Sequence, residues 1–264
     1  MQGRLTSAPQ IINVSAYDPK ERQRRGSAYS TSDLSALRRN GARALIARCG
    51  KGRTIDSKCG QFLAAAERQG LLLGAYFFVL DGVDPTWQAD RFISRMRSIK
   101  TAHRLKTQEI LLVGDFDSKS SVSDILRFID RVEKRTGKLP MIYLENSPGL
   151  RATLSRATSA QKRRIAQCPY WLALYSDNER GMETPARLMR QYGIWNRWVM
   201  WQYGGVHWDK RRGRSRPVHY NHGSWRSPTY FGNLDRPTER SVFNGSQAEL
   251  VAFWRQNAWT WRQP

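Results

Sequence analysis

Short apolar runs alternate with amphipathic stretches along most of the chain, and this alternation restricts the fold more than any other feature. The apolar runs are continuous, as in strands of a parallel sheet that is covered on both faces. The amphipathic stretches have a helical period, and residues 122–136 carry an apolar stripe that ends before Gly137. Strands are predicted over 11–14, 44–47, 71–79, 110–113, 141–143, 170–174 and 198–203, and helices over 34–39, 59–69, 85–98 and 122–136. Parallel β/α units of this number most naturally close into a barrel.

One domain accounts for the whole chain of 264 residues, because neither an internal repeat nor a linker interrupts the pattern. Residues 204–232 are the exception. They are rich in Arg, Lys, His, Trp and Tyr and are interpreted as a long insertion or surface loop. No apolar run approaches the roughly 18 residues of a membrane span. The first residues lack the apolar core of an ordinary secretory signal, which leaves the location of the protein open.

The chain is strongly basic, with 44 Lys and Arg against 22 Asp and Glu and a net charge of +22. A protein of this charge attracts polyanions, and nucleic acid, an anionic wall polymer or a membrane surface would each fit. A proteome that favours arginine would give the same charge without any such partner. The strongest basic run lies within 204–232 between Trp208 and Tyr220, and consists of Lys210, Arg211, Arg212, Arg214 and Arg216.

The three cysteines are Cys49, Cys59 and Cys168, and their spacing contains no CxxC pair, which argues against a zinc or iron–sulfur site. Cys49 and Cys59 bracket a loop-like segment. They would form a disulfide in an oxidising compartment and remain free thiols otherwise, with Cys168 unpaired in both cases.

Two carboxylates, Asp115 and Asp117, end the strand predicted over 110–113. In a parallel barrel the active groups lie at the carboxyl ends of the strands. Residues i and i+2 of a strand share a face, so the two side chains would lie about 6–7 Å apart. Paired carboxyl groups suit glycoside hydrolysis, in which one protonates the leaving group and the other stabilises positive charge. A divalent metal site or a solvated loop would also use two such residues.

Aromatic residues at predicted strand ends offer flat faces on which sugar rings stack, although packing in the barrel core would explain them equally well. With an adjacent glutamine, these candidate substrate contacts are Tyr76, Trp171, Tyr175, Trp201, Gln202 and Tyr203.

The order of the short motifs resembles the lysozymes of glycoside hydrolase family 25, and the resemblance spans about residues 11 to 254. Residues 11–17 (IINVSAY) resemble the family's opening GIDVSxYQ, and 74–78 (GAYFF) its GaYHF. Residues 113–117 (VGDFD) resemble its lDvE strand, 137–143 (GKLPMIY) its G..p.iYt, and 170–175 (YWLALY) its lWiA.Y. Its wQY matches 201–203, and its closing vD.n.f.G resembles residues 234–235 followed by 242–245.

This resemblance implies a flattened, incomplete β/α barrel whose site has four acidic positions. The proton-donating glutamate falls on Asp117, which is one methylene shorter. The aspartate before it falls on Asp115, which would stabilise charge or position the acetamido group of the substrate. The first-strand aspartate falls on Asn13, an amide, and the late aspartate on Asp235.

The resulting hypothesis is a muramidase that cleaves the β-1,4 bond between N-acetylmuramic acid and N-acetylglucosamine without a cofactor or metal. Whether an enzyme nucleophile or the substrate's acetamido group acts in the second step stays open. A catalytically weak or inactive barrel that binds cell-wall glycan is the first alternative, and a basic nucleic-acid-associated protein the second. A muramidase would act on the cell wall, with anionic wall polymers as further partners of the basic run.

Overall fold

The structure is a computed structural model. It describes residues 8–18, 28–144, 147–174, 184–209, 214–219 and 238–261. The strands are β1 (Gln10–Val14), β2 (Ala42–Lys51), β3 (Thr54–Ile55), β4 (Leu72–Val79), β5 (Glu109–Phe116), β6 (Met141–Leu144), β7 (Tyr170–Ala173), β8 (Met200–Asp209), β9 (Arg214–His219), β10 (Glu239–Phe243) and β11 (Trp259–Thr260). The helices are α2 (Thr31–Arg39), α3 (Cys59–Arg68), α4 (Pro85–Ala102), α5 (Val122–Thr136), α6 (Pro148–Ser155), α7 (Ser159–Ala166), α8 (Pro185–Tyr192) and α9 (Gln247–Asn257).

Eight of the described strands pair into a closed barrel in the order β1-β2-β4-β5-β6-β7-β8-β10. The pairs from β1 round to β8 are parallel. β10 is antiparallel to both β8 and β1, and it closes the ring where a further parallel β/α unit would otherwise stand. The mostly parallel β/α barrel predicted from the sequence is therefore confirmed.

Local sequence signals set the boundaries of the helices that cover the barrel. Helix α5 begins at a capping box formed by Ser121 and Asp124 and ends at Gly137, whose φ of 71° suits glycine. Helix α4 begins with Pro85, and the Asp84 side chain accepts hydrogen bonds from the Thr86 and Trp87 amides. These helices begin where the sequence predicted, although α4 continues beyond residue 98.

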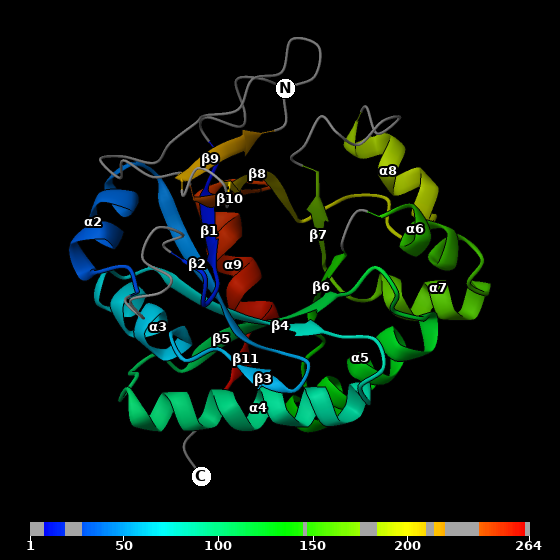
Figure 1. Cartoon of the computed structure of the whole chain (residues 1–264), viewed down its shortest axis with the longest axis horizontal. Helices are drawn as coiled ribbons and strands as arrows, with labels where there is room; N and C mark the ends of the chain where they lie inside the picture. Colours follow the sequence, from blue (N-terminus) through cyan, green and yellow to red (C-terminus); the bar gives the residue numbers. More distant parts are fainter. Residues whose placement is uncertain are drawn as a thin grey trace.

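The core has two parts. The larger lies between the strands and the surrounding helices and includes the buried stripe of α5. The smaller lies inside the barrel, where residues of the strands meet Leu250, Trp254 and Ala258 at the end of the chain. In the view of Figure 1, α9 (red) crosses the middle of the strand ring, and α2 to α8 lie around it. Only Leu250 and Trp254 of α9 are buried, so one face of the helix packs against the barrel and the other is exposed. The indole nitrogen of Trp254 donates to the carbonyl oxygen of Leu73 at 2.8 Å, which ties α9 to the start of β4.

Several elements were not predicted from the sequence, namely α6, α7, α8, α9, β3, β10 and β11. The segment 204–232 is partly a hairpin rather than a loop, because β8 extends into it and pairs antiparallel with β9. Cys49, Cys59 and Cys168 are free and buried. Within the described residues, no helix is both long and apolar enough to cross a membrane.

Candidate active site

Inward-facing side chains change from apolar to polar along the barrel strands. The interior core includes Ile11, Ile46, Val113, Met141 and Met200. Because side chains alternate along a strand, the next inward residue toward each carboxyl end lies two positions further on. Those residues are Asn13, Arg48, Asp115, Tyr143 and Gln202, and all of them line a cleft. The apolar layer thus forms the floor of a polar site.

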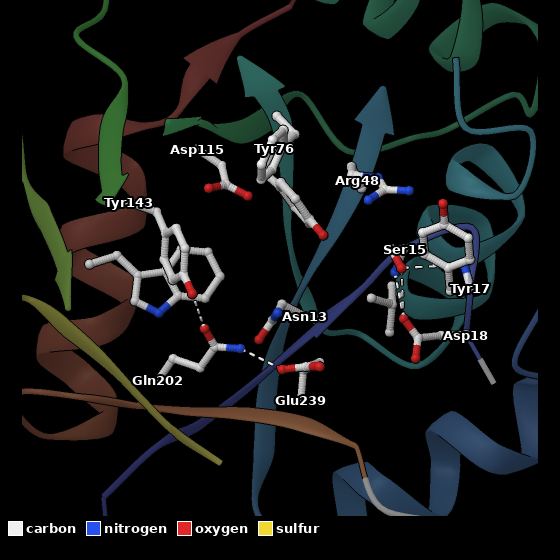
Figure 2. Close-up of a pocket in the computed structure, with 13 residues that line it drawn as sticks. Asn13, Ser15, Tyr17, Asp18, Arg48, Tyr76, Asp115, Tyr143, Gln202 and Glu239 are labelled. Atoms are coloured by element: carbon white, nitrogen blue, oxygen red, sulfur yellow. Dashed lines mark hydrogen bonds between the residues drawn. The ribbon is translucent and has the colours of Figure 1, made fainter. Parts of the chain in front are cut away.

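The cleft has a volume of about 210 Å³ and opens at the carboxyl ends of the parallel strands. Figure 2 shows its side chains converging from β1, β2, β4, β5, β6, β8 and β10. Its lining consists of Asn13, Val14, Ser15, Tyr17, Asp18, Arg48, Tyr76, Phe78, Asp115, Tyr143, Trp171, Gln202 and Glu239. Aromatic rings and three carboxyl groups therefore surround one space.

A chain of hydrogen bonds orients one of these carboxylates. The hydroxyl of Tyr143 lies 2.5 Å from Oε1 of Gln202, to which it donates. Nε2 of Gln202 donates to Oε2 of Glu239 at 2.6 Å, and the Val206 amide donates to Oε1 at 3.3 Å. Glu239 is thereby held at the cleft from two sides, and Figure 2 shows the hydrogen bond from Gln202.

The loop after β1 forms another wall. The Asp18 carboxylate accepts hydrogen bonds from the Ser15 amide at 2.8 Å and the Ser15 hydroxyl at 3.0 Å, which closes a tight turn. Arg48 pairs with Asp56 at 2.7 Å, and its guanidinium lies 5.1 Å from the centre of the Tyr17 ring. Tyr17 is 51% exposed, so an aromatic face lies open beside the cleft.

Two groups in the cleft have shifted pKa values. Burial raises the pKa of Tyr76 well above its ordinary value, and the negative charges of Asp115, Asp18 and Glu239 raise it further, against the opposing effect of Arg48. Tyr76 is therefore a neutral hydrogen-bond donor. Burial alone lowers the pKa of Arg48, but Tyr76 and Asp56 more than compensate, so its net shift is upward. Arg48 keeps its positive charge among the carboxylates.

Five residues that the sequence singled out share the cleft, namely Asn13, Tyr76, Asp115, Trp171 and Gln202. Asn13 is buried, and its Oδ1 has no hydrogen-bond partner among the described residues. Trp171 is also buried. Its indole nitrogen donates to the Ser241 hydroxyl at 3.0 Å, and its ring packs edge-on against Tyr143.

Asp117 has a different environment from Asp115. Strand β5 ends at Phe116, so Asp117 lies in the turn that follows and is not part of the cleft lining. Its Oδ1 accepts hydrogen bonds from the Ser118 hydroxyl at 3.2 Å and the Lys119 amide at 3.0 Å. The strand therefore ends between the two aspartates, and of the pair only Asp115 lines the cleft.

The structure does not place Trp201 and Tyr203 in the cleft. Both are buried in the outer core, because they flank the inward-facing Gln202 and so point the other way. The Trp201 indole donates to the Leu174 carbonyl oxygen at 2.9 Å, and the Tyr203 hydroxyl donates to Oε1 of Gln10 at 2.7 Å. Tyr175, Asp235, Lys210, Arg211 and Arg212 lie outside the described residues. Arg214 and Arg216 lie on β9, of which only the backbone is described.

Glu239 is the main cleft residue that sequence reasoning missed. The family motif vD.n.f.G places its aspartate six residues before its glycine, and counting back from Gly245 leads to Glu239 rather than Asp235. Arg48 and Asp18 carried no recognisable motif. Within the described part of the chain, no group of three or more His, Cys, Asp or Glu side chains could hold a metal ion.

A β/α barrel with carboxyl and aromatic side chains in a cleft at the strand ends has the architecture of a glycoside hydrolase. The model of glycosyl hydrolases family 25 matches residues 26–208, and the chain belongs to that family. No curated protein sequence matches the chain.

Solved structures show the same fold at low sequence identity. A lysozyme from Streptomyces coelicolor aligns with a TM-score of 0.61 and 20% identity, covering 96% of this chain and 100% of that one. A muramidase from Acremonium alcalophilum has a TM-score of 0.58 and 17% identity, covering 94% and 100%. A family 25 lysozyme from Aspergillus fumigatus has a TM-score of 0.57 and 18% identity, covering 94% and 99%.

Proposed function

We propose that the chain is an N-acetylmuramidase that hydrolyses the β-1,4 bond between N-acetylmuramic acid and N-acetylglucosamine in peptidoglycan. The observation that carries this proposal is that Asp115 and Glu239 face one aromatic-lined cleft. Hydrolysis of a glycosidic bond uses one carboxyl group to protonate the leaving oxygen and another to act at the sugar ring. Family membership, together with similarity to a lysozyme and muramidases, supports peptidoglycan as the substrate.

We assign proton donation to Asp115 and the stabilisation of positive charge to Glu239. Asp115 is only 8% exposed and lies on the aromatic wall of the cleft, beside Phe78 and Tyr143 in the sheet register. Glu239 is fixed by Gln202 and the Val206 amide, which suits a carboxylate that must keep one position while charge develops. Asp117, the donor expected from the sequence, is the competing assignment.

Substrate binding is assigned to the aromatic and neutral polar groups of the cleft. Tyr76 and Trp171 offer ring faces and edges, and the protonated Tyr76 hydroxyl is a hydrogen-bond donor. Asn13 stands where the family has an aspartate, and its amide supplies hydrogen bonds without adding a further negative charge to the cleft.

Reducing-sugar release from purified peptidoglycan, with the products identified by mass, tests the proposal. We expect new N-acetylmuramic acid reducing ends from the wild type, and a loss of roughly 100-fold or more in Asp115→Asn and Glu239→Gln. Asp130→Asn is the matched control, because Asp130 pairs with Arg164 on the outer surface. If Asp117→Asn abolishes release while Asp115→Asn only raises KM, Asp117 is the proton donor. Absence of release by the wild type on several walls would refute the enzymatic function.

Binding of cell-wall glycan without hydrolysis is the second candidate function. It is favoured by Asn13 in place of an acid and by the hydrogen bonds of Asp117 within its own turn. A binding protein would sediment together with insoluble peptidoglycan and release no reducing ends from it. We further propose that the basic run of 210–216 binds an anionic wall polymer. This partner is favoured over nucleic acid, because membership of the family suggests a substrate in the cell wall.

A further inference from the structure

A group of cations lies beside the cleft, beyond the carboxyl ends of β2 and β4. Its cations are Lys51 at the last position of β2, Arg53 in the turn before β3, and Arg91 in α4. The side chain of Trp87, in the first turn of α4, lies among them. We call these four residues the cationic rim. Figure 1 shows β3 close to α4, on the side of the barrel where β4 ends.

The cationic rim is continuous with the cleft through Phe78. This residue lines the cleft, and Nζ of Lys51 lies 4.7 Å from the centre of its ring. The amide of Gly52 donates to the Phe78 carbonyl oxygen at 3.0 Å, which joins the turn to β4. Gly52 has a φ of 53°, and a Cβ there would lie 2.5 Å from a Leu80 methyl carbon, so this approach requires glycine.

Trp87 gives the cationic rim an exposed aromatic face. It is 38% exposed and, with Tyr17, is one of two exposed large hydrophobic residues among those described. The guanidinium carbons of Arg53 and Arg91 lie 5.7 and 5.2 Å from its ring centre, within the range of cation–π contacts. The arginines are thereby held beside an open ring, and the Arg53 side chain is itself exposed.

The positive charge of the cationic rim is not neutralised by the described part of the chain. None of Lys51, Arg53 and Arg91 forms an ion pair with a described residue. Asp84, which precedes α4, is instead paired with Arg127. The cleft beside the rim carries three carboxyl groups, those of Asp115, Glu239 and Asp18, and one described cation, Arg48. Acids therefore predominate in the cleft and cations at its edge.

We propose that the cationic rim binds the carboxylates of the peptide branches of peptidoglycan while the glycan occupies the cleft. The inference rests on the proposed substrate and adds to it the preference for peptide-bearing strands over bare glycan. Carboxylates are repelled by the acids of the cleft and attracted by the rim, so the separated charges orient the strand. Trp87 supplies an apolar surface for the remainder of the peptide.

The test compares soluble glycan strands that carry their peptides with strands from which an amidase has removed them. Dissociation constants and cleavage rates are measured for the wild type and for Arg53→Gln/Arg91→Gln. We expect the wild type to bind peptide-bearing strands roughly 3- to 10-fold more tightly, and the double variant to lose most of that ratio. The preference should weaken as salt rises from about 0.05 to 0.5 M.

The matched control is Arg97→Gln, because Arg97 lies on the same helix with its guanidinium 5.6 Å from the ring of Trp259. It should leave the ratio unchanged. Equal binding of the two strands by the wild type, or an unchanged ratio in the double variant, overturns the proposal. So does tighter binding of strands that carry phosphate polymers, which would identify a phosphodiester ligand. Preferential binding without cleavage would refute only the muramidase activity, whereas cleavage without preference would refute only the rim assignment.

Discussion

Replacing Trp254 by alanine should destabilise the barrel severely, because this side chain fills its interior from the end of the chain. Trp254 is 1% exposed and packs in the inner core with residues of several strands. Its indole nitrogen also satisfies the Leu73 carbonyl oxygen at 2.8 Å. Its neighbours in the inner core belong mostly to paired strands, which limits how far the surroundings can collapse into the space.

The expected loss is about 3–5 kcal/mol of unfolding free energy, the usual cost of removing a buried tryptophan. Domains are stable by about 5–15 kcal/mol, so this is a large fraction of the total. At roughly 2–4 °C per kcal/mol for a chain of this size, the Tm should fall by roughly 6–20 °C. Trp254→Phe keeps most of the volume and loses the donor, so its cost should be about 1–2 kcal/mol.

Urea unfolding followed by circular dichroism measures these differences, with equal m-values required for the comparison. Trp87→Ala is the control, because Trp87 is largely exposed and its loss should cost no more than about 1 kcal/mol. A Trp254→Ala variant within about 1 kcal/mol of the wild type would show that α9 does not support the barrel interior.

Three further predictions follow from other parts of the structure. Gln202→Met removes the hydrogen bond that Gln202 accepts from Tyr143 and the one that it donates to Glu239, and should lower kcat/KM roughly 10- to 100-fold in the peptidoglycan assay, with Tm measured alongside to exclude unfolding. Asp84 has a pKa lowered by its hydrogen bonds with Thr86 and Trp87 and by Arg127. Because the folded-state pKa is lowered, the ionised carboxylate stabilises the folded protein at pH values above the ordinary aspartate pKa, and this stabilisation is lost as the pH falls. Asp84→Ala should therefore cost about 1 kcal/mol near pH 7 and progressively less below about pH 4 in urea titrations. Burial raises the pKa of Cys168 to about 12, so iodoacetamide at about pH 8 should alkylate it only after unfolding, and rapid labelling of the native protein by mass spectrometry would contradict its burial.

The barrel was predictable because its signals are local. The apolar runs of the strands, the stripe of α5 and the proline that begins α4 are each read within a few residues, and parallel connections then leave little choice of topology. Of the elements that escaped prediction, β10 depends on distant contacts, because it is recognisable only by its pairing with β1 and β8. Helix α9 did have a local signal, the capping box of Ser246 and Glu249, which went unrecognised.

Part of the cleft was predictable on the same grounds. Four cleft residues lie within or just after predicted apolar strands, namely Asn13, Tyr76, Asp115 and Gln202. In a parallel β/α barrel, the side chains at the carboxyl ends of the strands meet at one end of the barrel. Glu239 was missed, and the late aspartate was assigned to Asp235, because a motif separated from the preceding one by a long basic segment could be aligned in more than one way. The hydrogen bond from Gln202 to Glu239 favours the alignment that ends on Glu239.

The sequence by itself therefore determined the seven parallel strands of the barrel, the helices α2 to α5 and the end of the barrel that carries the site. Only the tertiary structure decided which side chains enter the cleft. In a strand that is buried on both faces, the residues of both faces are apolar, so the sequence does not show which positions face inward. Trp201 and Tyr203 were therefore as good candidates for the cleft as Gln202. The pairing of β8 with β7 and β10 removes this ambiguity, because it turns Gln202 inward to Glu239 and both aromatic rings outward into the core.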